Sequence, residues 1–417
     1  MMELLRFATA GSVDDGKSTL VGRLLFETKS VLADQLDAVE RVSVDRGLST
    51  PDLSLLTDGL RAEREQGITI DVAYRYFSTP RRSFILADTP GHVQYTRNTV
   101  TGASTSQLAV ILVDARHGVV EQTYRHTALL ALLRVPRLVL AVNKMDLVGY
   151  DEAVFDAIAA TFADLTATFE YPAEDVDVVP VSALDGDNVV VPSARMPWFR
   201  GPTLLHLLES TPIPAPELTQ PLRMPVQYVV RPRTGEHSDY RGYAGRISAG
   251  TVRDGDEVVI LPSGSRSSVR HVDTSHGRVD SAGAGRSATL VLDDDIDVAR
   301  GDLIVGADGA TAPTLRSDFE ATLCWLSDRP LDKGAKLLVR HGTRTTPCVV
   351  TALHGCVDIR TATTVPADQL AINDIGRVSI HTADLLPLEP YALSRATGGF
   401  LLIDPVSGNT LAAGLVA

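Results

Sequence analysis

Short, uninterrupted apolar runs alternate with stretches of helical apolar spacing over the first 210 residues. The uninterrupted runs predict buried β-strands at residues 4–8, 83–87, 108–113, 138–142 and 176–181. Apolar positions at helical spacing predict helices directly after residue 18 and at residues 121–133, 151–169 and 204–209. Continuous apolar strands separated by helices indicate a mostly parallel sheet with helices on both faces. We therefore predict an α/β domain over residues 1–212.

Residues 27–66 interrupt this alternation because they are polar and irregular. Helical spacing appears around residues 31–42, and turn-forming residues gather at 47–58. Strand-like alternation returns at residues 72–77. We predict an excursion from the sheet rather than a part of the core.

The pattern changes after residue 211, where five prolines fall between positions 211 and 225 and predict a stiff linker. Short β-type runs separated by Gly and Asp turns follow, at residues 226–230, 243–247, 257–261 and 288–292. Beyond a second seam at 306–313, further runs lie at 322–326, 336–339, 348–353, 376–380 and 400–403. We predict two all-β barrel domains, at residues 221–308 and 314–417.

Composition excludes several classes of protein. The net charge of −13 argues against broad binding to nucleic acid or anionic lipid, because these polyanions bind clusters of Lys and Arg side chains. No apolar run approaches the roughly 20 residues of a membrane span, and residues 1–6 lack an export signal, so we expect a cytoplasmic protein. Cys324, Cys348 and Cys356 lack metal-ligand spacing, which favours ordinary thiols.

The segment from Gly11 to Ser18 reads G-S-V-D-D-G-K-S and matches the phosphate-binding pattern G-x-x-x-x-G-K-[ST]. It follows a predicted strand and opens a predicted helix, as that motif requires. Backbone N–H groups of such a loop converge on anionic oxygens at a helix N-terminus. Lys17 would reach the β- and γ-phosphates, and the Ser18 hydroxyl would bind Mg²⁺. A plain glycine turn before a helix is the alternative.

Other strand ends carry further candidates. Asp88 follows a buried strand and could hold Mg²⁺, and the Gly91 amide could meet the γ-phosphate, although Asp-Thr-Pro-Gly could also be an ordinary turn. Thr69 stands in a loop long enough to fold over the nucleotide, where its hydroxyl would complete the Mg²⁺ shell only with a third phosphate present. His92 is placed to orient the attacking water.

Asn143-Lys144-Met145-Asp146 follows the next buried strand and predicts the choice of base. Guanine offers N1–H and an N2 amine side by side, and one carboxylate can accept from both, whereas adenine cannot donate in this way. Asp146 would thus select GTP over ATP, with Asn143 supporting N7 and Lys144 lying against the base. Ser182-Ala183-Leu184 would supply an amide to the guanine O6.

Together these motifs predict a P-loop GTPase domain that uses GTP and Mg²⁺. The expected catalytic residues are His92, Lys17 and Thr69, and the expected metal ligands are Ser18, Thr69 and Asp88. We give Asp14 and Asp15 no catalytic part and expect their carboxylates to point away from the phosphates. The predicted nucleotide-binding residues are Gly11, Ser12, Val13, Asp14, Asp15, Gly16, Lys17, Ser18, Thr19, Asp88, Gly91, Asn143, Lys144, Asp146, Ser182, Ala183 and Leu184.

The chain resembles the translation-factor class of GTPases through residues 67–70, 88–92 and 143–146, with Gly-Ile-Thr-Ile, Asp-Thr-Pro-Gly-His and Asn-Lys-Met-Asp. Within that class it is most similar to the sulfate adenylyltransferase subunit 1 family. The stretches that carry this are 7–20, 65–75, 87–98, 240–245 and 398–404. An elongation factor would usually have His at Ser12 and Asp15 and Arg at Gln66.

The resemblance implies a large GTP-hydrolysing subunit in a hetero-oligomer. Its smaller partner would join ATP and sulfate into adenosine 5′-phosphosulfate and pyrophosphate, and GTP hydrolysis would pull that uphill synthesis forward. Some relatives carry a fused adenylylsulfate kinase, which we do not expect here because no second phosphate loop follows. Two alternatives stay open: a translation GTPase that binds RNA, and a GTP-dependent binding module without turnover.

Overall fold

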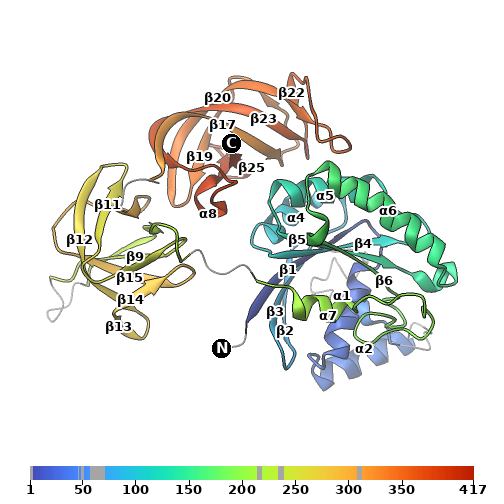
Figure 1. The fold of residues 1–417 in the computed structure, drawn as a ribbon. Helices are drawn as coiled ribbons and strands as arrows, with labels where there is room; N and C mark the ends of the chain where they lie inside the picture. Colours follow the sequence, from blue (N-terminus) through green and yellow to red (C-terminus); the bar gives the residue numbers. More distant parts are fainter. Residues whose placement is uncertain are drawn as a thin grey trace. The chain divides into compact units, whose positions relative to one another are not determined.

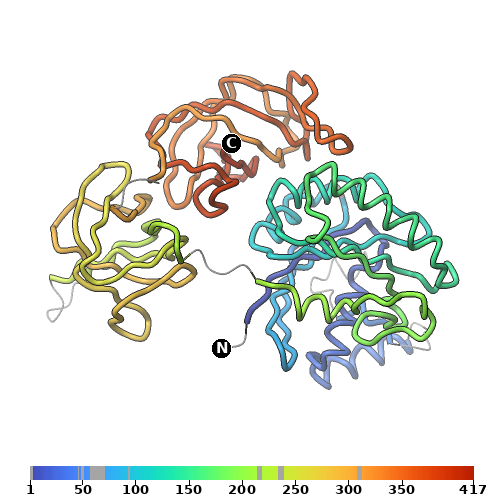
Figure 2. The backbone as a smooth tube through the Cα atoms, in the orientation of Figure 1, coloured from blue at the N-terminus to red at the C-terminus, as the bar shows by residue number. Residues whose placement is uncertain are grey.

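The computed structural model describes residues 3–45, 47, 51–56, 71–213, 218–232, 239–307 and 312–417. The chain divides into two compact units, shown as a ribbon and as a backbone tube in Figures 1 and 2. The first comprises Met1–Ile213 with Ile359–Thr363, and the second comprises Pro214–Asp358 with Thr364–Ala417.

The first unit is built on a six-stranded sheet in the order β2-β3-β1-β4-β5-β6. Every neighbouring pair is parallel except the edge pair β2–β3. The carboxyl ends of the five parallel strands therefore meet at one edge, where ligands collect in open α/β sheets. The strands are β1 (Leu4–Gly11), β2 (Ala73–Ser78), β3 (Ser83–Asp88), β4 (Leu108–Asp114), β5 (Arg137–Asn143) and β6 (Val176–Pro180).

Helices cover both faces of this sheet (Figure 1). The described α-helices of this unit are α1 (Lys17–Glu27), α2 (Ala33–Asp45), α4 (Thr96–Ala103), α5 (Glu121–Leu132), α6 (Glu152–Thr168) and α7 (Leu204–Ser210). Short 3₁₀ turns are η1 (Leu53–Leu56), η2 (Val93–Tyr95), η3 (Met145–Val148) and η4 (Ala173–Asp175). Helices α1 and α7 share one apolar core with β1, and α4, α5 and α6 lie across the other face.

The apolar runs in the sequence correspond closely to these elements. All residues of β4 are buried, as expected for a central strand covered on both faces. Among the described α-helices of the first unit, α4 is the one that the apolar pattern did not predict. Its buried face includes Thr96 and Thr99, whose hydroxyls hide the helical spacing.

Two large β-sheets make up most of the described part of the second unit, and neighbouring strands in both are antiparallel. The strands of the first sheet are β7 (Arg223–Pro225), β8 (Tyr228–Val230), β9 (Gly242–Arg246), β11 (Glu257–Leu261), β12 (Ser265–Thr274), β13 (Gly277–Val279), β15 (Ser287–Leu292) and β16 (Leu303–Gly306). A separate pair joins β10 (Thr251–Arg253) to β14 (Ser281–Gly283).

The second large sheet runs β19-β24-β25-β17-β23-β20-β21, and an additional pairing of β19 with β20 closes it into a barrel. Its strands are β17 (Thr314–Trp325), β19 (Lys336–His341), β20 (Arg344–Val357), β21 (Thr364–Val365), β23 (Ile375–Leu388), β24 (Gly399–Ile403) and β25 (Thr410–Val416). The short pair β18 (Leu331–Asp332) and β22 (Gln369–Leu370) and the one-turn helix α8 (Arg395–Gly398) complete it.

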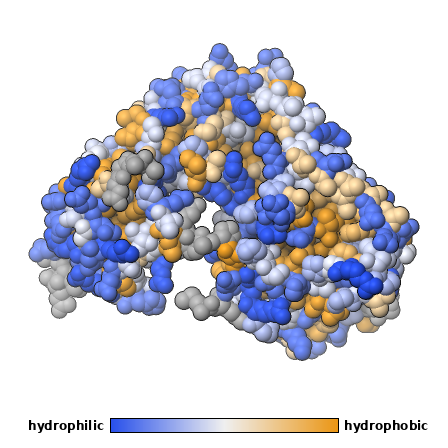
Figure 3. Space-filling model, viewed as in Figure 1, coloured by the Kyte–Doolittle hydropathy of each residue, from blue (hydrophilic) through white to orange (hydrophobic). Residues whose placement is uncertain are grey.

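These sheets confirm the predicted all-β architecture after the α/β domain. The polar strand β12, with four serines and threonines among its ten residues, escaped prediction because too few apolar residues mark its alternation. Hydrophilic residues are spread over the visible face of both units, and hydrophobic ones form separate patches (Figure 3). Within the described ranges no helix has the length and apolarity needed to cross a membrane.

The three cysteines behave as ordinary thiols. Cys324 and Cys348 are buried, Cys356 is half-buried, and none of the three forms a disulfide bond. Burial raises the pKa of the Cys348 thiol to about 12, which keeps it protonated and unreactive.

Candidate functional site

The phosphate-binding loop joins the end of β1 to the start of α1, as its motif requires. Gly16 has a φ of 90°, in the left-handed region that favours glycine. A Cβ at Gly16 would also lie 2.4 Å from Nδ2 of Asn143. Glycine at position 16, the second glycine of the motif, is thus required both by its backbone conformation and by the Asn143 side chain packed against it.

Lys17 lies inside the loop, with only 7% of its surface exposed. Its Nζ donates to the carbonyl oxygens of Gly11 at 2.8 Å and Ser12 at 2.7 Å. Burial lowers the pKa of the Lys17 ammonium, while the Asp15 and Asp88 carboxylates act in the opposite direction. The ammonium is therefore held at one place in the loop before any ligand arrives.

The two aspartates of the loop differ. Asp15 is 6% exposed, and its Oδ2 accepts from the Ser12 amide at 2.6 Å. Burial raises the pKa of the Asp15 carboxyl, although Lys17 and the Ser12 amide oppose this. Asp14 is exposed and has a φ of 65°. Asp15 thus braces the loop from within, and its carboxylate is not part of the wall that faces solvent.

A polar hollow of about 400 Å³ lies in front of the loop. Its lining combines the loop, the end of β3 and the end of β5, as expected for strand ends that share one edge. The lining residues are Val13, Asp14, Gly16, Lys17, Ser18, Thr19, Ser54, Gly91, His92 and Lys144. Most of the predicted phosphate-binding residues therefore come together. Thr69 lies outside the described residues.

Gly91 packs directly on the phosphate loop. A Cβ at this position would lie 2.4 Å from the Lys17 Nζ and 2.7 Å from the Gly11 carbonyl oxygen. Glycine is needed there to let the backbone approach the loop. His92 is half-buried in the wall of the hollow, with its ring edge-on to Tyr95 at 6.1 Å between centroids.

Asp88, three residues before Gly91, ends β3 and is 1% exposed. Its Oδ1 accepts from the Thr9 hydroxyl at 2.9 Å, which fixes the carboxylate against β1. A hydroxyl of the adjacent Thr89 donates to the Thr9 carbonyl at 2.6 Å. The Thr9 hydroxyl therefore orients the buried carboxylate that was predicted to reach Mg²⁺, and the Thr89 contact ties the end of β3 to β1.

Asn143 ties the two predicted base-contacting segments to the phosphate loop. Its Nδ2 donates to the Asp15 carbonyl at 2.7 Å, and its Oδ1 accepts from the Ala183 amide at 2.9 Å. Of the three amides in the segment predicted to face the guanine O6, that of Ala183 thus already has a partner within the protein. Asp146 is half-buried in η3, and the Leu184 side chain, in the other predicted base-contacting segment, is 57% exposed.

Lys144 has a φ of 63° and is anchored at its tip. Its Nζ contacts the Asp14 carbonyl and lies 3.0 Å from Oδ2 of Asp114. Asp114 is buried, which by itself raises its pKa, but hydrogen bonds from Arg116 and Lys144 hold that pKa well below the ordinary value. A permanently ionised carboxylate therefore fixes the Lys144 stem beside the hollow.

Two of these residues were missed from the sequence. Ser54 lines the hollow from η1, within a stretch whose polar composition gives no sign of a site. Asp114 stands directly after the apolar run of β4, so the strand-end rule used for Asp88 could have found it. A larger hollow in the second unit, beside Tyr240 and Arg241, contains none of the predicted residues.

Known proteins match the chain along its length. Residues 2–219 match the family model described as elongation factor Tu GTP binding domain, and residues 318–417 match that described as GTP-eEF1A C-terminal domain-like. Sulfate adenylyltransferase subunit 1 of Methylorubrum populi is 49% identical over 416 residues, covering 99% of this chain and 87% of that protein. The chain belongs to the sulfate adenylyltransferase subunit 1 family.

Other relatives agree with this assignment. Sulfate adenylyltransferase subunit 1 of Laribacter hongkongensis is 48% identical, covering 99% of this chain and 85% of that protein. The bifunctional enzyme CysN/CysC of Mycobacterium tuberculosis is 51% identical over 418 residues, covering 100% of this chain and 67% of that protein. The predicted family and fold class are both confirmed, and this sulfate adenylyltransferase subunit 1 homologue carries its GTP-binding domain at residues 2–219.

Proposed function

We propose that this chain binds and hydrolyses GTP as the large subunit of a sulfate adenylyltransferase. In this proposal GTP hydrolysis drives a partner subunit that converts ATP and sulfate into adenosine 5′-phosphosulfate and pyrophosphate. The observation that carries the proposal is the hollow in which Lys17, Ser18, Gly91 and His92 meet beside Lys144. The names of the relatives support the choice of partner reaction.

The phosphate side of the site follows from its charges and amides. Lys17 would bind the phosphate oxygens, and the loop amides at the start of α1 would donate to them. The Gly91 backbone is close enough to the loop that its amide can meet the terminal phosphate. His92, in the wall of the same hollow, would orient the attacking water, the role that a glutamine plays in other GTPases.

The residues present fit Mg²⁺, which prefers hard oxygen ligands. Ser18 offers a hydroxyl in the wall of the hollow, and Asp88 offers a carboxylate that Thr9 orients. These two side chains, with Thr69, would hold the ion, which would neutralise charge on the phosphates. Among the described residues no cluster of three or more His, Cys, Asp or Glu side chains forms a site of its own for a metal.

The base would be chosen by Asp146, with Asn143, Lys144 and the segment Ser182–Leu184 around it. We further propose a cytoplasmic location and domain boundaries at residues 1–212, 221–308 and 314–417. The smaller subunit that binds ATP and sulfate is the proposed partner.

The decisive experiment purifies the chain with its native neighbours and measures sulfate adenylylation with and without GTP. We expect product to form faster and further with GTP, and GDP to accumulate in parallel. Equal product formation with and without GTP would contradict the coupling. Absence of any partner reaction but salt-sensitive RNA binding would instead favour a translation GTPase.

His92→Ala tests the hydrolytic step in the same complex. Nucleotide binding should be unchanged, because His92 lies in the wall of the hollow and is not part of the phosphate loop itself. GTP turnover should fall by about 10²-fold or more. Turnover is measured as phosphate release. Normal turnover would remove His92 from the mechanism.

A further inference from the structure

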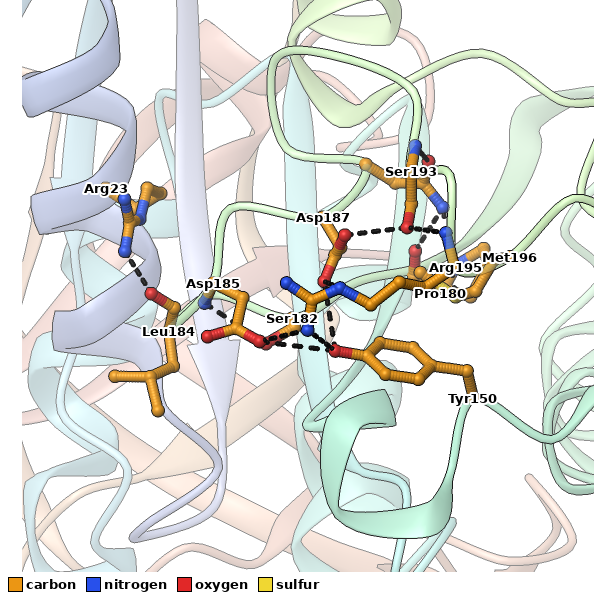
Figure 4. A network of polar contacts seen from close by, with 11 residues as sticks. Arg23, Tyr150, Pro180, Ser182, Leu184, Asp185, Asp187, Ser193, Arg195 and Met196 are labelled. Carbon is orange, nitrogen blue, oxygen red and sulfur yellow. Dashed lines mark hydrogen bonds and ion pairs between the residues drawn. The ribbon is translucent and has the colours of Figure 1, made fainter.

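A cluster of four polar side chains lies beside the proposed base site, and neither the motifs nor the proposed function uses it. We name Tyr150, Asp185, Asp187 and Arg195 the clasp. Figure 4 shows these four side chains converging on one point, with Leu184 and Arg23 beside them. Each member comes from a loop at the carboxyl edge of the first sheet.

The contacts within the clasp are mutual. The Arg195 guanidinium lies 2.6 Å from Oδ2 of Asp185 and 3.7 Å from Oδ2 of Asp187. The Tyr150 hydroxyl donates to both carboxylates at 3.2 Å. The guanidinium also lies over the Tyr150 ring, 5.2 Å from its centroid. Removing Arg195 would therefore leave two carboxylates facing each other around one hydroxyl.

The clasp connects the ends of the two segments that would contact guanine. Tyr150 closes the turn that contains Asp146, since its amide donates to the Met145 carbonyl at 2.8 Å. Asp185 directly follows Leu184, and its amide donates to the Ser182 hydroxyl at 3.2 Å. These segments follow different strands, β5 and β6, so the clasp fixes the distance between them.

A second tie links the base segment to the helix that follows the phosphate loop. Arg23 on α1 donates from Nε to the Ala183 carbonyl at 3.1 Å and from a terminal nitrogen to the Leu184 carbonyl. Glu27, one turn later, orients Arg23 through an ion pair at 3.6 Å. Arg23 therefore couples the position of the base segment to α1.

The segment that supplies Arg195 is itself held in place. The Ser193 hydroxyl donates to Oδ1 of Asp187 at 2.6 Å, and its amide donates to Oδ1 of Asn188 at 2.7 Å. Asn188 in turn donates to the Pro180 carbonyl at 2.9 Å, which fixes the loop to the end of β6. Trp198 donates from Nε1 to the Tyr150 carbonyl at 3.0 Å.

Charge and exposure indicate what the clasp can do. The Arg195 side chain is 52% exposed, and exposed ion pairs contribute little to global stability. Burial, with the Asp187 and Asp185 carboxylates, raises the pKa of Tyr150 to about 12, so its hydroxyl stays a donor at neutral pH. The effect of the clasp is therefore local restraint of two loops rather than stability of the domain.

We infer that the clasp and Arg23 are positioning residues that set how slowly a guanine nucleotide leaves the site. They hold the segments around Asp146 and Leu184 at the separation that a guanine base requires. The inference rests on the proposed function, because it assumes that guanine nucleotide binds here. Dissociation of a base requires these segments to separate, and the clasp opposes that separation.

The test follows dissociation of N-methylanthraniloyl-GDP from the full chain by stopped-flow fluorescence. Arg195→Met should dissociate the nucleotide about tenfold faster, with the association rate nearly unchanged. Arg195→Lys retains the ion pair but not the planar stacking on Tyr150, so its dissociation rate should lie between those of wild type and Arg195→Met. Arg200→Met is the matched control, because Arg200 is an exposed arginine of the same segment and should behave as wild type.

Base discrimination separates positioning from general damage. Inosine diphosphate lacks the 2-amino group, so Arg195→Met and Tyr150→Phe should lose more affinity for GDP than for IDP. A merely structural lesion would weaken both nucleotides equally and lower the thermal midpoint, and that result would overturn the inference. Dissociation of Arg195→Met within twofold of both wild type and Arg200→Met would overturn it as well.

The same experiment separates the two proposals. If wild type binds GDP but the clasp variants release it at the wild-type rate, only the clasp inference fails. If wild type binds neither labelled GDP nor labelled GTP in the presence of magnesium, the proposed function fails and this inference falls with it.

Discussion

Two side chains of the first unit carry expectations at the scale of single residues: Asp146 for the choice of nucleotide base, and His126 for the dependence of stability on pH. In our proposal the choice of guanine depends on Asp146, whose half-buried carboxylate stands in η3, three residues after the Asn143 anchor. His126 is a second residue of this kind. It lies on α5 with 1% of its surface exposed, close enough to Lys17 for the ammonium to affect its titration.

Asp146→Asn should change the preferred base. An amide offers a donor where the carboxylate accepts from guanine N1–H and N2, so GTP should bind at least tenfold more weakly, whereas xanthosine triphosphate should gain affinity. Affinities for both nucleotides are measured by calorimetry with magnesium present. Glu152→Gln, on the exposed surface of α6, is the control, and an unchanged preference in Asp146→Asn would refute the assignment of this carboxylate.

His126 should make the first unit less stable in acid. Burial, with the Lys17 charge, lowers the pKa of His126 from 6.5 to about 3. Below pH 6.5 the unfolded chain therefore binds a proton at this residue that the folded chain does not, and the free energy of unfolding falls as the pH falls. This contribution is complete above the unfolded pKa and is lost progressively towards the folded one.

The variant His126→Gln should lack this contribution. Between pH 6.5 and the folded pKa, its free energy of unfolding should therefore change with pH less steeply than that of wild type, by up to about 1.4 kcal/mol per pH unit. Urea unfolding is followed by the fluorescence of Trp198 in a Trp325→Phe background, from about pH 7 to about pH 5. Carboxylates titrate equally in both proteins, so the difference in slope isolates His126. Parallel slopes would show that this histidine does not titrate as its burial implies.

At the scale of elements, the helix α1 connects the phosphate loop, η1 and the base segment. Gly22 on α1 allows η1 to approach, because a Cβ there would lie 2.0 Å from the Leu53 carbonyl oxygen. This contact brings Ser54 into the wall of the hollow. Arg23, the next residue, reaches the base segment instead.

Gly22→Ala should therefore destabilise the first unit by about 1–3 kcal/mol, because the added methyl overpacks against the η1 backbone. Intrinsic propensity predicts the opposite sign, since Ala is favoured over Gly in a helix by about 1 kcal/mol. Chemical unfolding reports the stability, and nucleotide titration should show weaker binding as Ser54 moves. Glu40→Ala on the exposed face of α2 is the control, and a more stable Gly22→Ala would contradict the contact.

At the scale of the whole molecule, an ion pair links the two large sheets of the second unit, with its arginine buried and its glutamate partly buried. Arg223 of β7 is 4% exposed, and its terminal nitrogen lies 3.0 Å from Oε1 of Glu389, which follows β23. The Thr397 hydroxyl donates to Oε2 of Glu389 at 2.5 Å. Arg344 and Asp302 form a second pair between the sheets at 2.8 Å.

Arg223→Met should destabilise the second unit by about 1–3 kcal/mol, because it leaves the partly buried Glu389 carboxylate without its cation. The double variant Arg223→Met with Glu389→Leu should lose less free energy of unfolding than Arg223→Met, since no unpaired carboxylate remains at this site. Urea unfolding monitored through Trp325 in a Trp198→Phe background measures both. A double variant that is less stable than the single one would show that the pair itself, rather than its desolvation, dominates.

The sequence by itself determined the elements of the first unit and most of its candidate site. Buried parallel strands require continuous apolar runs, so β1, β3, β4, β5 and β6 could be recognised, and polar residues at their ends had to meet at one edge. Gly16 and Lys17 followed from a local motif whose backbone conformation is encoded within a few residues.

Only the tertiary structure decided the rest. Helix α4 buries Thr96 and Thr99 beside Val100, and strand β12 buries Ser267 beside Val269 and Val272. With polar residues at part of each buried face, too few apolar residues mark the periodicity. Ser54, Arg23 and the clasp act through contacts between segments far apart in the chain. Such contacts depend on how the strands and helices pack, and a polar residue carries no mark in the sequence of which distant backbone group it will meet.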